Sequence, residues 1–521
     1  MTDRPDPLLT RCEFVATSAA AGAAVAMGSD LRAAETPARK PNIIFIFADQ
    51  MRAHVLGCYG NEIVPTPNFD AMARAGTVCD NAISTWPVCS PYRAMLLTGL
   101  HPMANGTVSN DVGYIDGLPS IATACREQGY ATGYIGKWHL EWNRNPFVPK
   151  DRRMGFDYWA VNNCTHQYMD HFYCTDTPAK IHFKGYDAFV QTDLAIDYIK
   201  RNASTSSAQA NPFCLFVSWG PPHDPYNKIP EDYKKRVPLD SIKLRQNVHE
   251  REIVDWLIAR DEPTPQVIER RKKRRAILDD DERLKKEQLQ GYYAHTTALD
   301  DCIGKLREAL KEEGIAEDTI LVFASDHGDM LGCHRMSLKQ MPFEESIRVP
   351  FLVEYAKAVP AGRRSDVLVA PIDIMPTLLS LAGLACPAVD GKDLAGAMKG
   401  GDSDQQDAVL ITKMVGGRGG GPYCFNAITP WHGVRTKRYT YVNLMGYGPW
   451  LLYDNQEDPY QLNNLLALHS SESDVGIGVP EHAERSATLE KRMRELMKDA
   501  GDPGDSDKVA AYIASRQPKK K

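Results

Sequence analysis

Cys89 and Arg93 stand four residues apart in the run Cys89-Ser90-Pro91-Tyr92-Arg93, which leads into an apolar stretch. This order predicts that both residues lie at the N-terminus of a helix, where backbone N–H groups and the helix dipole favour anions. The pattern indicates a nucleophile beside a group that holds an anion. For a cysteine taken alone, the competing interpretation is a buried, inert thiol.

Four short apolar runs are typical of buried parallel strands. They are Ile43–Phe47, Ala131–Ile135, Phe213–Trp219 and Ile320–Ala324. Polar residues of catalytic type follow them closely: Asp49-Gln50, Gly136-Lys137-Trp138-His139, Gly220-Pro221-Pro222-His223-Asp224 and Ser325-Asp326-His327-Gly328. Because α/β sheets bind ligands at the carboxyl ends of their strands, these four ends are expected to form one site.

Two of these strand ends carry the side chains that metals prefer. Asp49, Gln50 and Asp326 offer carboxylate and amide oxygens, and His327 offers an imidazole. Oxygen donors suit hard divalent cations such as Ca²⁺, whereas the imidazole leaves Mn²⁺ or Zn²⁺ open. Each acid taken alone is more typical of a strand-end cap or a loop hydrogen bond, but their position and pairing favour a metal site.

The run from Cys89 to Arg93, with the following Leu96-Leu97-Thr98-Gly99, resembles the Cys-x-Pro-x-Arg signature of type I sulfatases in the alkaline phosphatase superfamily. In that family a maturation enzyme oxidises the cysteine to formylglycine. Tyr92 departs from the family, which most often has serine or another small residue there. The resemblance covers roughly residues 41–384, with weaker support from residues 452–465. It implies an α/β fold with a large mixed, mainly parallel sheet between helices.

The resemblance also implies a role for each residue that matches the family's motifs. Asp49, Gln50, Asp326 and His327 would hold a divalent metal, usually calcium, although the family often has Asp in place of Gln50 and Asn in place of His327. The catalytic positions would be Cys89, Arg93, Lys137, His139, His223 and Lys339. Arg93 and Lys137 would bind the nucleophile and the sulfate, His139 would help to break down the intermediate, and His223 with Lys339 would protonate the leaving alcohol.

A hydrated aldehyde suits this chemistry because it carries two hydroxyls. One hydroxyl attacks sulfur and expels the alcohol, and the second collapses to the aldehyde and releases inorganic sulfate. Neither cysteine nor serine has a second hydroxyl that could release the sulfate in this way. Fixed cations and a proton donor lower the barrier because negative charge grows on the bridging oxygen as the S–O bond breaks.

The composition describes an ordinary globular protein: 521 residues, 43% hydrophobic, 25% charged, with a formal net charge of −6. No global basic signal points to nucleic acid. The basic run 270–275 is followed at once by the acidic run 279–282, which favours a solvated, charge-balanced helix. Twelve cysteines are too dilute for a disulfide framework, and no pair has zinc-knuckle spacing.

Three regions are expected along the chain. Residues 1–40 read as an export signal and linker, residues 41–385 as the catalytic α/β domain with a helical insertion at about 242–290, and residues 386–521 as a C-terminal α+β subdomain. In that subdomain, the runs 436–443 and 450–454 predict a small antiparallel sheet, and the segment 481–498 predicts a polar helix.

The N-terminus resembles an export signal of bacterial type. Arg4 and Arg11 precede the apolar stretch Phe14–Met27, which is too short and too weakly apolar to span a bilayer. The segment Arg11–Val15 is similar to a twin-arginine core that lacks its second arginine. We therefore expect a periplasmic or extracellular protein without a membrane span, with a disordered tail as the alternative.

The expected function is hydrolysis of a sulfate monoester, with carbohydrate sulfates ranked above aryl sulfates and a formylglycine-generating enzyme as maturation partner. Aromatic residues in loops are candidates for sugar contact or for simple packing: Tyr168, Phe172, Tyr173 and Trp431. Two alternatives stay open. One is a phosphonate monoester or phosphodiester hydrolase of the same superfamily, and the other is an inactive protein that binds sulfated glycans.

Overall fold

The computed structural model describes residues 40–142, 144–203, 212–250, 282–401, 406–415, 430–467, 477–478 and 480–517. These residues all belong to one compact unit, 40–521. The predicted export signal and most of the predicted insertion at 242–290 lie outside the described residues. None of the described helices is long and apolar enough to cross a membrane.

An eight-stranded sheet forms the centre of the fold, in the order β10-β2-β9-β8-β1-β7-β3-β4. β9 runs antiparallel to both of its neighbours, and the other adjacent pairs are parallel. The expectation of a mixed, mainly parallel sheet is confirmed. The strands are β1 (Asn42–Asp49), β2 (Thr77–Ala82), β3 (Ala131–Lys137), β4 (Tyr158–Asn162), β7 (Phe213–Pro222), β8 (Thr319–Ser325), β9 (Phe351–Glu354) and β10 (Arg363–Val369).

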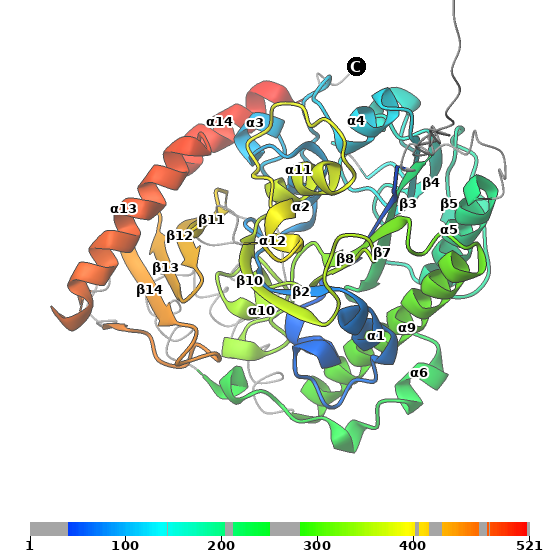
Figure 1. The fold of residues 1–521 in the computed structure, drawn as a ribbon. Coiled ribbons are helices and arrows are strands. Elements are labelled where there is room, and N and C mark those ends of the chain that lie inside the picture. The colour runs from blue at the N-terminus through cyan, green and yellow to red at the C-terminus, as the bar shows by residue number, and fades with distance from the viewer. Residues whose placement is uncertain are drawn as a thin grey trace, which may run out of the picture. The chain divides into compact units, whose positions relative to one another are not determined.

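Helices cover both faces of this sheet, as Figure 1 shows. Alternate residues of β1 point to opposite faces. Ile43 and Phe45 join a core with α2 (Cys89–Thr98), α4 (Ile121–Glu127) and α11 (Pro371–Leu381). Ile44 and Ile46 join a second core with α1 (Pro67–Ala75), α5 (Asp187–Ala203) and α9 (Glu282–Glu312). Burial on both sides is why this strand reads as a continuous apolar run.

The four strands whose ends carry the predicted site are β8, β1, β7 and β3, and they are consecutive and parallel in the sheet. Their carboxyl ends therefore meet at one edge, as predicted. The register between β1 and β7 shifts between Ala48 and Asp49, so that Asp49 pairs with Pro222. This shift determines which residues at the end of β7 lie beside Asp49.

Gly136 allows β3 and β7 to approach at the site. Its φ is +103°, and a Cβ there would lie 2.1 Å from the carbonyl oxygen of Ser218. We expect Gly136→Ala to lower the free energy of unfolding by about 2 kcal/mol or more, because it combines backbone strain with a clash against backbone. Denaturant unfolding checks this, with Gly129→Ala as control. Gly129 also has a positive φ, but a Cβ added there would meet nothing within 4 Å.

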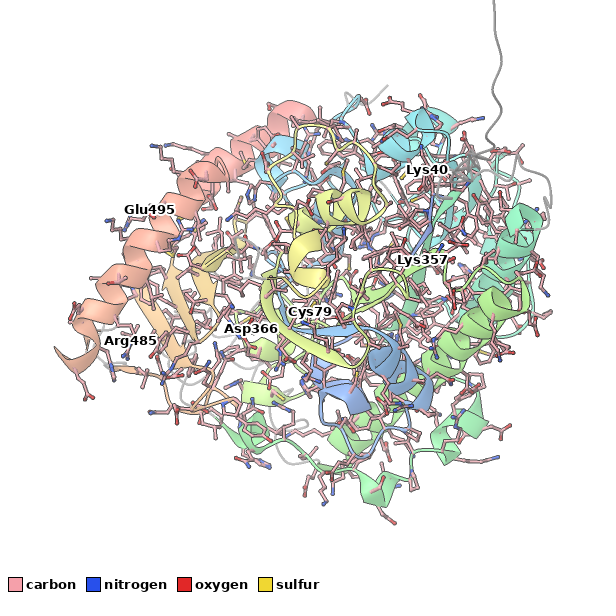
Figure 2. The ribbon with its side chains drawn as sticks, in the orientation of Figure 1. Lys40, Cys79, Lys357, Asp366, Arg485 and Glu495 are labelled. Carbon is pink, nitrogen blue, oxygen red and sulfur yellow. The ribbon has the colours of Figure 1, made fainter. Side chains whose placement is uncertain are left out.

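The C-terminal part has its own four-stranded antiparallel sheet, made of β11 (Ala408–Lys413), β12 (Trp431–Thr436), β13 (Tyr439–Leu444) and β14 (Gly448–Asp454). Helix α13 (Ala483–Asp499) lies along this sheet (Figure 1). Leu489 and Met493 of α13 are buried against it, while Glu495 is on the exposed outer side (Figure 2). Helix α14 (Ser506–Arg516) follows. The predicted small sheet and packing helix are confirmed.

Short elements complete the described chain: α3 (Pro102–Asn105), α6 (Glu231–Lys235), α10 (Glu344–Ile347), α12 (Ala395–Met398), the pair β5 (Phe172–Tyr173) and β6 (Ile181–His182), and the pair β15 (Leu466–Ala467) and β16 (Ile477–Gly478). The ten cysteines in the described part of the chain are free thiols.

Candidate active site

Cys89 is the first residue of α2, and every residue of this helix is buried. Val88 before it is extended, and Pro91 falls in the first turn, where a missing N–H costs no helical hydrogen bond. Arg93 follows one turn later, and residues four apart lie on the same face of a helix. The spacing of the sequence motif is thus the spacing of one helical turn at the edge of the sheet.

The thiol of Cys89 lies among residues from three strand ends. Its Sγ is 3.7 Å from Asp49 Oδ1, 3.3 Å from His327 Nε2 and 3.8 Å from Lys137 Nζ. One ligand atom from each of Asp49, Cys89, Asp326 and His327 lies within 4.8 Å of the others. We call these four residues the central cluster, and all of them are buried.

Arg93 forms hydrogen bonds to groups at or near the ends of four strands. Its Nη2 donates to Asp49 Oδ2 at 3.1 Å and to Asp326 Oδ2 at 2.9 Å. Its Nη1 donates to the Lys137 carbonyl and to Ser218 Oγ, both at 2.7 Å. One guanidinium therefore contacts β1, β8, β3 and β7, and its geometry fixes the positions of both carboxylates.

The buried charges shift one another's pKa values. Burial raises the pKa of Asp49, but Lys137, His223 and Arg93 hold it well below its usual range. Burial and the Asp49 charge raise the pKa of Asp326. Burial also raises the pKa of the Cys89 thiol, yet the cations Lys137, Lys339 and His327 bring it well below that of a free cysteine. The site therefore favours an anion at position 89.

The ring of His327 is oriented as a metal ligand would be. Its Nδ1 lies 3.0 Å from the Gly328 carbonyl oxygen, which can only accept, so Nδ1 carries the proton. Its Nε2 lies 3.7 Å from Asp49 Oδ1 and 3.5 Å from Asp326 Oδ1. Burial lowers the pKa of His327, but Asp326 and Cys89 raise it above its ordinary value. With Nδ1 as the donor, Nε2 is the nitrogen that would face a divalent metal together with the carboxylate oxygens of Asp49 and Asp326, and this donor set fits such an ion.

Gln50 lies between the central cluster and a second group of cations. Its φ is +69°, and its backbone N–H donates to Asp326 Oδ1 at 3.0 Å. Its side-chain oxygen accepts from Lys339 Nζ at 2.5 Å, and its Nε2 donates to Asp329 Oδ2 at 2.6 Å. Asp49 and Asp326 bind Arg93 through Oδ2 and each have a second oxygen, whereas Gln50 has a single side-chain oxygen and Lys339 occupies it.

Lys339 and His223 form a buried pair on the other side of Gln50. The Nδ1 of His223 lies 2.8 Å from the Asp224 carbonyl oxygen and carries the proton, so Nε2 accepts from Lys339 Nζ. Both side chains are less than one-tenth exposed. The structure brings these two residues together although they are more than a hundred positions apart in the chain.

His139 lies two residues after β3, and its main chain contacts the first turn of α2. Its φ is +57°, and its carbonyl oxygen accepts from Ser90 Oγ at 2.6 Å. Neither ring nitrogen has a hydrogen-bond partner among the described residues; Asp111 Oδ1 is 3.6 Å from Nε2. Burial lowers the pKa of His139, but Cys164 and Asp111 raise it to about 10. This buried imidazole is therefore positively charged, and it forms an ion pair with Asp111 across 3.6 Å.

The sulfatase family profile matches residues 41–384 of the chain, which is well over half of its length. The chain belongs to the sulfatase family. It is a sulfuric ester hydrolase, as the sequence predicts. A second profile, described as N-sulphoglucosamine sulphohydrolase, C-terminal, matches residues 332–496.

Curated relatives and solved structures agree with this assignment. A protein of Formosa agariphila named ulvan-active sulfatase is 35% identical, over 89% of this chain and 82% of the relative. An endo-4-O-sulfatase of Bacteroides thetaiotaomicron is 28% identical, over 91% and 94%. A solved protein in complex with its substrate D-glucosamine-2-N,6-O-disulfate has the same fold, with a TM-score of 0.73 at 23% identity over 90% of this chain and all of that one.

Sequence reasoning missed His166 of this sulfatase. Its ring stacks on that of His223 with a centroid distance of 4.1 Å and an interplanar angle of 9°, and its Nε2 is 3.5 Å from Lys137 Nζ. Burial and the nearby His223 and Lys137 lower its pKa to about 2, so the ring is neutral. A signal was present, because His166 follows the apolar run of β4 just as the predicted residues follow their strands.

Two of the aromatic residues predicted as candidates for sugar contact are packed inside the sulfatase. Tyr168 is fully buried and its hydroxyl donates to the His223 carbonyl at 2.9 Å. Trp431 is 2% exposed, and its indole donates to the Gln340 carbonyl. Phe172 and Tyr173 are half-buried in the short β5–β6 pair. For Tyr168 and Trp431, packing is the interpretation that holds.

Proposed function

We propose that this sulfatase hydrolyses sulfate monoesters of a carbohydrate, with a formylglycine derived from Cys89 as nucleophile. The arrangement of Cys89 supports this proposal. Its Sγ lies in a buried cluster that combines two carboxylates, the imidazole of His327 and the ammonium of Lys137. A group held there is kept anionic and oriented, which is what attack on sulfur requires.

Each cation of the site has a part in the proposed reaction. Arg93 fixes Asp49 and Asp326, and Lys137 neutralises charge beside Cys89. The protonated imidazole of His139, which lies 3.6 Å from Asp111, binds a sulfate oxygen. Fixed cations that cost no reorganisation stabilise the charge that grows in the transition state.

Asp49, Asp326 and His327 would hold a divalent metal, with Gln50 adjacent to them. When bound, such an ion lowers the pKa of an oxygen nucleophile and polarises the S–O bonds. Two carboxylates match the charge of Ca²⁺, which we propose as the resident ion. The neighbouring residues keep the carboxylates in place, since Arg93 holds both and the Gln50 N–H holds Asp326.

A formylglycine at position 89 supplies one hydroxyl for attack and a second through which sulfate leaves. The test of the proposal is the mass of the peptide that carries Cys89, after production of the protein with a formylglycine-generating enzyme, together with sulfate release. Loss of H₂S and gain of one oxygen, with release of sulfate from a glycan, supports the proposal. An unmodified thiol in a protein that binds sulfated glycans without cutting them would instead show a binding protein.

His223 and Lys339 are expected to protonate the leaving alcohol. For His223→Gln and Lys339→Met we expect kcat on a sugar sulfate to fall by about 10²- to 10⁴-fold, but far less on 4-nitrophenyl sulfate, whose leaving group needs no proton. His432→Gln is the matched control, because His432 is a buried histidine paired with Asp502 in the C-terminal part. Equal losses on both substrates would contradict the assignment.

The relatives favour carbohydrate over aryl sulfates as substrates, since one is named for ulvan and another is an endo-4-O-sulfatase. A phosphonate monoester or phosphodiester substrate is the second candidate, on the grounds of the Asp49-Gln50 and Asp326-His327 pairs. The ratio of turnover on matched aryl sulfate and aryl phosphodiester substrates separates the two.

Export is part of the proposal and is supported by the sequence of residues 1–40 alone. The basic residues and the apolar stretch Phe14–Met27 match a signal that is removed after transport. N-terminal sequencing of protein from the periplasm or medium is expected to find a mature chain that begins between residues 34 and 41. An intact N-terminus in the cytoplasm would contradict export.

A further inference from the structure

A pocket of about 530 Å³ adjoins the proposed active site. It is lined by Tyr114, Ile115, Asp116, Glu141, Trp142, Arg152 and Arg516. None of these residues belongs to the reaction described above. They come from four segments: the loop 114–116, the loop after β3, the short turn that holds Arg152, and the end of α14.

Two loops connect this pocket to the active site. His139 and Asp111 approach each other within 3.6 Å at the site. Two or three residues further along the same loops, Glu141 and Tyr114 line the pocket. Because an extended chain advances at most about 3.5 Å per residue, the pocket begins within roughly 10 Å of His139. A ligand longer than one sulfated unit can therefore reach both places.

Arg152 lines the pocket, where two carboxylates hold its guanidinium and one of its nitrogens has no hydrogen-bond partner among the described residues. Its Nε is 3.3 Å from both carboxylate oxygens of Glu141, and its Nη1 donates to Asp116. Its guanidinium lies 4.1 Å from the centre of the Tyr114 ring. Its Nη2 is buried and has no hydrogen-bond partner within the described ranges. The Tyr114 hydroxyl is likewise buried without a partner among the described residues, and Tyr114 as a whole is 5% exposed. Unpaired buried donors are rare in the absence of a ligand.

The lining also includes an aromatic surface. Trp142 is partly exposed and is backed by Arg516, whose guanidinium lies 5.7 Å from the indole and donates to the Gly113 carbonyl at 2.9 Å. A Cβ on Gly113 would lie 2.6 Å from the indole, so glycine is what admits Trp142 here. The C-terminal helix therefore helps to hold this wall in place.

We propose that this pocket is a subsite for a saccharide residue that neighbours the sulfated one on the same glycan. The inference rests on the proposed function. Acidic and guanidinium groups side by side hydrogen-bond to adjacent hydroxyls, and an indole packs on the apolar face of a sugar ring. The pocket contains two carboxyl groups and two guanidiniums, so its formal charges balance, although burial raises the pKa of Glu141 to about 7. Without a formal excess of cations it suits an uncharged sugar better than a second sulfate.

Two variants test the subsite: Arg152→Ala, which removes the fixed donor, and Trp142→Ala, which leaves the Arg152 ion pairs intact. The substrates are a sulfated tetrasaccharide prepared from ulvan or carrageenan and 4-nitrophenyl sulfate, which spans only the sulfate site. The expected result is a fall of about 10-fold in the ratio of kcat/KM on the tetrasaccharide to that on the aryl sulfate, carried by KM. Arg236→Ala is the control, because Arg236 pairs with Asp301 away from the pocket.

An unchanged ratio in both variants would overturn the subsite, as would equal losses on the two substrates. Saturation-transfer NMR with the desulfated tetrasaccharide gives a readout that needs no turnover. If the wild-type enzyme cleaves no sulfate ester, the proposed function fails, and the subsite is then decided by whether this signal is present in wild type and lost in both variants.

Discussion

Replacing Cys89 by alanine is expected to lower kcat for sulfate ester hydrolysis by about 10⁵-fold or more, because the nucleophile is lost while the binding groups remain. The remaining cations still hold the sulfate, so binding should change much less than kcat. Steady-state kinetics and calorimetric binding of a sulfated oligosaccharide measure the two effects. The fold should persist, because Cys89 is a small side chain at the first turn of α2.

Cys89→Ser separates the nucleophile from the release step. A serine hydroxyl is able to attack sulfur, but it lacks a second hydroxyl through which sulfate leaves, so this variant is expected to turn over at most once and to gain the mass of one SO₃ group. Cys302→Ala is the matched control, since Cys302 is a buried cysteine on α9, in the helix layer rather than at the strand ends. Normal turnover by the alanine variant would end the formylglycine account.

Removal of the metal is expected to have the second largest effect. We expect chelation, or Asp326→Asn, to lower activity by roughly 10³-fold or more, because the oxygen nucleophile and the sulfate lose their strongest electrostatic partner. Ca²⁺ should restore the chelated wild type. A bound ion also stabilises the fold, by about 2.7 kcal/mol when its free concentration is about 100-fold above Kd. Thermal unfolding with and without Ca²⁺ measures this.

A variant of a proposed metal ligand and a control variant show whether stabilisation by Ca²⁺ depends on that ligand. In Asp326→Asn the stabilisation by Ca²⁺ should disappear, whereas in Asp300→Asn it should remain. Asp300 is also a buried carboxylate, but it accepts hydrogen bonds from the N-terminus of α1. Asp49→Asn should also lose intrinsic stability, because Arg93 and Lys137 are buried cations that share this carboxylate. Stabilisation by Ca²⁺ that is unaffected in Asp326→Asn would contradict the proposed ligands.

Most of the fold could be predicted from sequence because its signals are local. β1, β3, β7 and β8 are continuous apolar runs because a strand that is buried on both faces has apolar side chains on both. Their order in the sheet is a tertiary property, yet the polar residues after each run indicated that the four ends meet. The motif from Cys89 to Arg93 is likewise local, since it is one turn of a helix.

Other parts of the site had no local signal. Tyr168 looks like a loop residue in sequence, yet it lies in the core, because the loop that carries it packs against the residues after β7. Asp111 and Trp142 belong to irregular loops, and nothing periodic marks the point at which a loop turns toward the site. The residues that we assign to the subsite were therefore absent from the sequence-based candidates.

The sequence by itself determined the type of chemistry: a cysteine and an arginine at one helical turn, acids and cations after apolar strands, and the sulfatase pattern that these residues form. Only the tertiary structure decided which of those groups touch. The Lys339–His223 pair, the stack of His166 on His223 and the bridge from Gln50 to Lys339 join segments that are far apart in the chain. Such contacts depend on strand order and on loop packing, and these are set by burial of the whole core rather than by any local run of residues.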